Sequence, residues 1–128
     1  MTAFQHAVLW IDHHQARLFR LMPERVEKMK LHADHHHFHR EQDSLGSRRE
    51  RDRVFFAAVS DALGECPEVL LLGPGNARAE FLSHIEEHRP AQMRHILGNQ
   101  ACDDEGDEAL VEKGRRFFRA ADRMLPAG

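Results

Sequence analysis

A histidine tract is the first part of the sequence whose residue types could carry chemistry. The chain holds 11 histidines in 128 residues, and five of them fall between positions 32 and 39. A zinc ion, or another divalent transition-metal ion, needs only three or four such ligands at bonding distance. The candidate metal ligands are His32, His35, His37 and His39. A solvated loop without a bound metal has the same composition, so both interpretations stay open.

An arginine-rich segment at 48–53 follows the tract and suggests a different chemistry. These arginines open a predicted helix, where the positive end of the helix dipole disfavours cations. A phosphate partner would explain the placement, and so would a solvated face balanced by Glu50 and Asp52. Imidazoles could add donors for phosphates and stacking surfaces for bases. The candidate RNA- or ribosome-binding residues are His35, His36, His37, His39, Arg48, Arg49, Arg51 and Arg53.

A Gly-Pro-Gly-Asn motif lies between a short apolar run and a helical segment. Free backbone amides at the start of a helix can hold an anion, so Gly73, Gly75 and Asn76 are candidate anion-binding residues. A tight turn that needs glycine only for its backbone freedom would have the same sequence. The motif alone does not separate these two roles.

Hydrolytic chemistry has less support in the sequence. Two-metal nucleases need several carboxylates around a pair of divalent ions, and Asp12 is suitably placed after the first apolar run. The fourth predicted strand, however, ends in Gly-Pro without a carboxylate. Only helix acids such as Glu50 and the acidic stretch at 103–107 remain to complete a site. We therefore expect a protein without catalytic activity and keep a degenerate metal-dependent hydrolase or nuclease as an alternative.

Composition limits the class of protein further. A formal net charge of −3 argues against coating nucleic acid through bulk positive charge, so any RNA contact must be local. The sequence shows no secretory signal and no run long enough to cross a bilayer, so we expect a cytoplasmic location without a membrane partner. Cys66 and Cys102 match no zinc spacing and are expected to be free thiols. A homo-oligomer stays open.

Apolar patterns predict five strands. Nearly continuous apolar runs at 7–11 and 69–72 are typical of strands covered on both faces. Alternating segments at 16–22 and 26–31 predict two antiparallel strands, and residues 95–97 are the expected core of a fifth strand. The first three strands should form a meander, and the last two should be joined by right-handed crossovers.

Three helices are predicted between and after these strands. The first begins at Ser47, where Ser-Arg-Arg-Glu has the spacing of a capping box. Its expected buried stripe is Val54, Phe55, Ala58, Val59, Ala62 and Leu63. The second follows Asn76 and stops at Pro90, and the third follows the acidic stretch, with Gly114 placed for a close contact.

The resulting order, β-β-β-α-β-α-β-α, predicts an α/β fold of the ribonuclease H-like type. Its mixed five-stranded sheet should carry helices on both faces. A length of 128 residues with 41% hydrophobic content fits one core, so we expect one domain over residues 1–128. The histidine-rich segment at about 32–46 lacks apolar periodicity and is predicted to be a mobile loop.

The motifs also resemble known families. The apolar run at 69–72, its Gly-Pro-Gly turn and the following helix with Phe81 resemble the middle domain of Pelota and of archaeal or eukaryotic class I release factors. The segment at 45–49 falls where release factors carry their catalytic Gly-Gly-Gln before a similar helix. The resemblance implies a translation-related role. Gly-Gly-Gln is absent from this chain, so hydrolysis of peptidyl-tRNA is not expected.

Nearly the whole chain resembles the small bacterial family called translational machinery proteins. The matching segments are 9–13 with 16–17, the histidine tract, 73–75 and the ending at 118–125. This resemblance implies ribosome-related work. The combined prediction is a noncatalytic module that contacts the ribosome or a structured RNA through residues 32–53. A metal-binding protein that uses the histidine-rich loop is the alternative.

Overall fold

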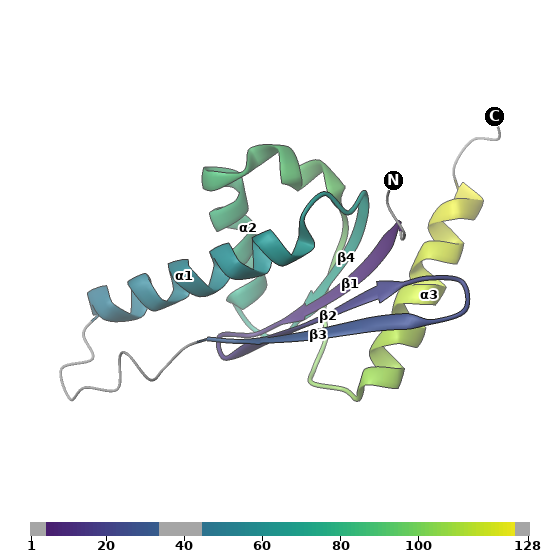
Figure 1. Cartoon of the computed structure of the whole chain (residues 1–128), viewed down its shortest axis with the longest axis horizontal. Coiled ribbons are helices and arrows are strands. Elements are labelled where there is room, and N and C mark those ends of the chain that lie inside the picture. Colours follow the sequence, from purple (N-terminus) through teal and green to yellow (C-terminus); the bar gives the residue numbers. More distant parts are fainter. Residues whose placement is uncertain (1–4, 34–44, 125–128) are drawn as a thin grey trace.

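The computed structural model describes residues 5–33 and 45–124, and these form a five-stranded mixed sheet with helices on both faces (Figure 1). Its strands are β1 (His6–Ile11), β2 (Gln15–Leu21), β3 (Val26–His32), β4 (Glu68–Gly73) and β5 (Ile96–Ala101). The strand order is β3-β2-β1-β4-β5. The first three strands form an antiparallel meander, and β4 and β5 run parallel to β1. The predicted ribonuclease H-like fold is therefore confirmed.

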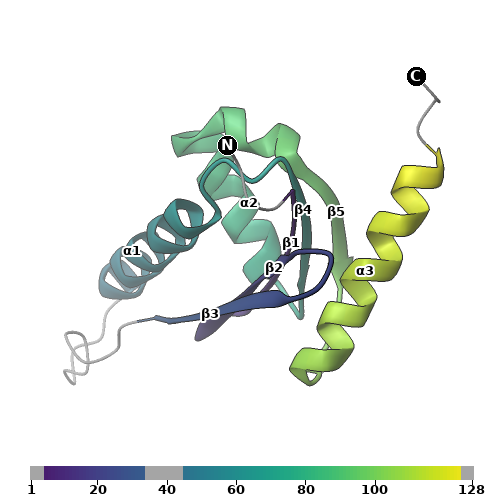
Figure 2. The same cartoon turned by 45° about the vertical axis from the view of Figure 1, so that its right-hand side comes forward.

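The helices are α1 (Leu45–Leu63), α2 (Ala77–His88) and α3 (Asp107–Met124), with a short 3-10 helix, η2 (Pro90–His95), after α2. Figure 2 shows α1 and α2 on one face of the sheet and α3 on the other. The central strands β1 and β4 are covered on both sides, which explains why their sequences are almost continuously apolar. None of the described helices is long and apolar enough to span a membrane.

Two hydrophobic cores lie on the two faces of the sheet. On the face of α1 and α2, strand residues such as Leu9 and Leu71 pack against Phe55 and Phe81. On the face of α3, Trp10 packs with neighbours that include Leu110 and Phe118. Alternate residues of β1 and β2 supply the two cores, because successive side chains of a strand point to opposite faces of the sheet.

Two glycines allow close backbone packing. Gly114 seats α3 on β1, because a Cβ at this position would overlap the Val8 side chain. Gly73 ends β4 with a φ of +153°, and a Cβ there would overlap the Ile11 carbonyl oxygen. Both positions therefore exclude larger residues for steric reasons. The sequence places Gly114 for a close helix contact, and the structure shows a close contact whose partner is the strand β1.

The buried face of α1 differs from the predicted stripe. Phe55, Phe56 and Val59 are buried, whereas Val54 is 53% exposed and Ala58 is also exposed. Val54, Phe55 and Phe56 are consecutive apolar residues of α1. The helical periodicity alone therefore does not determine which two of them face the sheet. The helix also begins two residues before Ser47, which places Ser47 inside the helix and contradicts its predicted capping position.

The short helix η2 has no counterpart among the elements predicted from the sequence, and it replaces the expected start of the fifth strand. His95 belongs to η2, and β5 begins at Ile96. In η2, Gln92 is buried and donates hydrogen bonds from Nε2 to the carbonyl oxygens of Ser60 (3.1 Å) and Gly64 (2.9 Å). These bonds satisfy backbone acceptors at the end of α1. No apolar periodicity marks such a polar element in the sequence.

Most of the predicted histidine loop lies outside the described residues. His35, His36, His37 and His39 are among these, so their roles and the loop's mobility stay predictions. His32 is described and ends β3 as an exposed residue. Cys66 and Cys102 are buried free thiols, as expected.

Candidate nucleic-acid interface

A cleft is lined by residues of the β1–β2 turn, of the first turns of α1 and of the start of α2. Figure 1 shows the start of α1 toward the end of the sheet where β1 turns into β2. The volume of the cleft is about 530 Å³. The lining residues are His13, His14, Arg48, Arg49, Arg51, Asp52 and Glu80. We call this hollow the α1 cleft.

Asp12 shapes the turn that presents the two histidines. Its Oδ1 accepts hydrogen bonds from the backbone amides of His14 (2.7 Å) and Gln15 (2.8 Å). This is the turn geometry in which an aspartate side chain replaces a backbone acceptor. The amide of Ala33 in turn donates to the carbonyl oxygen of His14 (2.9 Å). The chain therefore leaves β3, just before the histidine tract, beside the α1 cleft.

His13 and Asp52 define the polar interior of the cleft. His13 Nε2 lies 3.0 Å from Glu80 Oε1, and both side chains are almost half exposed. Partial burial raises the pKa of Asp52 above its ordinary value. The charges of His13 and Arg51 oppose this rise, and Glu80 adds to it. The cleft thus brings a partly desolvated carboxylate close to several cationic groups.

The four predicted arginines divide into two sets. Arg48, Arg49 and Arg51 line the α1 cleft, and the first two are exposed. Arg53 pairs instead with Glu50 and lines a second hollow, of about 270 Å³, between α1 and the end of α2. Helical geometry explains the division, because positions 51 and 53 point to different sides of the helix. RNA or ribosome binding by Arg53, as by Arg48, Arg49 and Arg51, stays a prediction.

The Gly-Pro-Gly turn connects β4 to α2. Gly75 has a φ of +59° and Asn76 precedes the helix, yet the Asn76 side chain makes no capping hydrogen bond. The first turn of α2 also carries Glu80, which disfavours an anion nearby. Backbone freedom accounts for the glycines at 73 and 75. Anion binding by Gly73, Gly75 and Asn76 stays a prediction.

The acids considered for a nuclease site have other partners among the described residues. Glu50 pairs with Arg53, and the acidic stretch at 103–107 lies on the face of α3. There Arg17 Nη1 donates to the Glu105 carbonyl oxygen (3.0 Å) and to Asp107 Oδ1 (2.9 Å), while Nη2 donates to Asp104. These contacts give the acidic stretch a structural partner.

Arg17 is a structural residue that the sequence analysis did not single out. Its guanidinium lies over the Trp10 ring, 4.7 Å from the centroid, and its side chain is 10% exposed. Trp10 Nε1 donates to the carbonyl oxygens of Cys102 (3.2 Å) and Asp103 (3.1 Å). Two features of the sequence could have predicted this role. Arg17 lies on an inward face of an alternating strand, and the chain has a separate acidic stretch that can pair with a buried cation.

Solved structures similar to this chain include two Pelota proteins and an archaeal translation termination factor. Archaeoglobus fulgidus Pelota matches with a TM-score of 0.61 and 19% identity over 87% of this chain. Thermoplasma acidophilum Pelota matches with a TM-score of 0.56 and 17% identity over 84% of it. The archaeal translation termination factor aRF1 matches with a TM-score of 0.57 and 18% identity over 93%.

The resemblance to Pelota and release factors is confirmed at the level of the fold. This chain covers 30%, 30% and 38% of those three chains, so it corresponds to about a third of each. No family model matches the chain, and neither does any curated protein. Membership of the bacterial translational machinery family stays a prediction.

Proposed function

We propose that this chain is a noncatalytic, translation-related module that binds the ribosome or a structured RNA through the α1 cleft. The observation that carries the proposal is the convergence of three arginines and two histidines from two elements on one hollow. The chain as a whole is acidic, with a net charge of −3, so this local excess of cations stands out. The similar fold of an archaeal translation termination factor supports a translation-related function.

The side chains of the cleft suit a phosphate backbone and unpaired bases. Guanidinium groups bind phosphate oxygens through paired donors, and imidazole rings offer both a donor and a stacking face. A volume of about 530 Å³ is within the range of ordinary ligand sites. Glu80 and Asp52 offset part of the positive charge, which favours binding by a matched geometry over diffuse attraction.

The histidine tract would extend this surface. Ala33, which precedes most of the tract in sequence, donates its backbone amide to the carbonyl oxygen of His14, a residue that lines the α1 cleft. Metal binding by His32, His35, His37 and His39, with zinc as the candidate ion, is a second proposal. It rests on ligand chemistry in the sequence.

Sedimentation with ribosomes tests the proposal on the untagged, full-length protein. The cleft variant carries Arg48→Gln, Arg49→Gln and Arg51→Gln. The control variant carries Arg94→Gln, Arg116→Gln and Arg119→Gln, which remove the same charge from exposed residues of η2 and α3. Circular dichroism confirms that both variants are folded.

The cleft variant should lose most of its ribosome association at low salt, and the control should pellet like the parent. Each phosphate contact contributes roughly 0.7 to 0.9 to the slope of log affinity against log salt concentration. The cleft variant should therefore show a slope lower by about 2 to 3. Equal weakening in the two variants would show that binding depends only on net charge and would remove the α1 cleft as the contact surface.

A further inference from the structure

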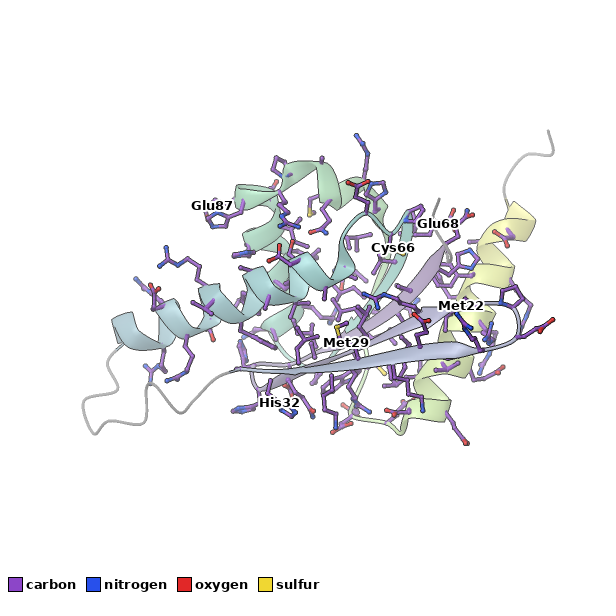
Figure 3. All side chains as sticks on the ribbon, viewed as in Figure 1. Met22, Met29, His32, Cys66, Glu68 and Glu87 are labelled. Carbon is purple, nitrogen blue, oxygen red and sulfur yellow. The ribbon has the colours of Figure 1, made fainter. Side chains whose placement is uncertain are left out.

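A second group of ligand-type side chains lies at the opposite end of the sheet from the α1 cleft. His6 is the first residue of β1, Glu68 is the first residue of the neighbouring parallel strand β4, and the two are paired in register. Asp122 lies near the end of α3. One imidazole nitrogen and one oxygen from each carboxylate all lie within 4.8 Å of one another. Figure 3 shows Glu68 near α3, far from His32 at the other end of the sheet.

Packing fixes the imidazole of this group. His6 stacks on Phe118 with ring centroids 4.2 Å apart and an interplanar angle of 9°. Its Nε2 lies 2.9 Å from Glu68 Oε1, and both side chains are about three-quarters buried. Phe118 is four residues before Asp122, so the same side of α3 supplies the stacking ring and the second carboxylate.

The charge of the group is unbalanced. Two carboxylates face one imidazole, and Asp122 forms no ion pair with any other side chain that the structure describes. The nearby thiol of Cys66 belongs to the core on the other face of the sheet, so it does not join the group. A cation bound between the three ligand atoms would neutralise both carboxylates.

We propose that His6, Glu68 and Asp122 bind a divalent transition-metal ion, with zinc as the best match. Magnesium and calcium prefer all-oxygen ligands, whereas an imidazole nitrogen favours zinc and its neighbours. Three protein ligands with a water in the fourth position form a known tetrahedral zinc arrangement. Bond lengths near 2.1 Å require ligand atoms roughly 3.4 Å apart, which a small movement of the exposed Asp122 side chain can achieve.

The bound ion would link the end of α3 to the first residues of β1 and β4. It would displace the proton between His6 Nε2 and Glu68 Oε1, which is released to solvent, and it would add Asp122 as a third ligand. This site shares no residue with the α1 cleft or with the histidine tract. The proposal therefore stands or fails independently of the proposed RNA binding.

Zinc calorimetry on the untagged full chain tests the site. All samples carry His32→Ala, His35→Ala, His37→Ala and His39→Ala, so that the candidate ligands of the tract do not contribute. Asp122→Asn and His6→Gln each remove one ligand. Asp103→Asn is the matched control, because Asp103 is an exposed aspartate outside the group. Magnesium serves as the ion that the site should reject.

The parent of this series, which carries only the four histidine substitutions in the tract, should bind one zinc ion per chain. It should give no heat with magnesium at the same concentration. Asp122→Asn and His6→Gln should each weaken zinc binding by about 10- to 100-fold or more, since even supporting residues of metal sites have effects of that size. Asp103→Asn should bind like the parent. Absence of stoichiometric zinc binding, or affinity unchanged in a folded Asp122→Asn protein, would overturn the proposal.

Discussion

Arg17 and the arginines of the α1 cleft are the same type of residue in two opposite settings. Arg17 is almost buried, lies over Trp10 and donates to Asp104, Glu105 and Asp107. Arg48 and Arg49 are exposed at the rim of a hollow that also contains two histidines. Arg17 therefore stabilises the fold, whereas the exposed Arg48 and Arg49 belong to the proposed binding surface.

The acidic stretch shows the same contrast from the side of the carboxylates. Lys28 lies 3.6 Å from Asp107, and Lys113 lies 3.7 Å from Glu105, in addition to the contacts of Arg17. Cations of the protein thus surround this stretch, while the α1 cleft holds more arginines than carboxylates. A net charge of −3 describes neither region, because each region has its own charge balance.

Arg17→Ala should have the largest effect on stability. It removes a buried cation together with its hydrogen bonds and its contact with Trp10, and breaking a buried ion pair typically costs about 3 to 5 kcal/mol. Because Asp104 and Asp107 can regain water, we expect a value near the lower end of that range. Urea unfolding measures it. A loss within about 0.5 kcal/mol, typical of surface substitutions, would contradict the structural role.

Gly114→Ala should destabilise the α3 face by about 1 to 3 kcal/mol, because the added methyl group overlaps Val8. Ribosome association of the folded variant should match that of the parent, since α3 does not line the α1 cleft. Thermal unfolding and sedimentation together check this separation. If the Gly114→Ala protein is fully folded and still associates more weakly with ribosomes, packing on the α3 face is coupled to binding at the α1 cleft.

Asp52→Asn should strengthen RNA binding, in contrast to the loss of the cleft arginines. Removing a carboxylate next to a phosphate relieves a repulsion of about 1 kcal/mol in water, or roughly fivefold in affinity. The raised pKa of Asp52 also means that its ionisation opposes folding. The neutral carboxyl of Asp52 favours folding relative to the ionised one. This stabilisation is fully present below the pKa of Asp52 in the unfolded chain, and it is lost as pH rises through the higher pKa of the folded protein. The asparagine variant should therefore be slightly more stable at neutral pH in urea titrations.

His84 should give the smallest effect, confined to acidic pH. Burial lowers its pKa, with His88 adding to the shift, and its ring packs against Phe56. The unfolded chain therefore binds a proton more readily than the folded protein, so stability should fall as pH drops below about 6.5. His84→Gln should reduce that fall by less than about 1 kcal/mol. An identical pH profile in the variant would assign the pH dependence to other groups.

Much of the fold could be predicted because local patterns encode it. The apolar runs of β1 and β4 and the alternation of β2 and β3 gave the sheet and its topology. The inward face of α1 was harder, because Val54, Phe55 and Phe56 are all apolar and neighbouring. The polar η2 left no periodic signal, so its buried Gln92 could not be anticipated.

The candidate sites were predictable only in part, because they depend on contacts between distant residues. The arginine-rich start of α1 was visible in the sequence, but Glu80 lies 67 residues from its partner His13. His6, Glu68 and Asp122 were equally hidden, since each is an ordinary residue until the sheet and α3 bring them together. Only the register of β1 with β4 places the first two side by side.

A nuclear magnetic resonance titration with a short structured RNA locates the binding surface residue by residue through the shifts of the backbone amides. We predict that the amides perturbed at low RNA concentration lie around His13 and His14, along the start of α1 and near Glu80. Amides around Arg17, in the acidic stretch and along α3 should stay in place. Perturbations centred on α3 or the acidic stretch, with the α1 cleft unchanged, would contradict the proposed division between a structural and a binding region.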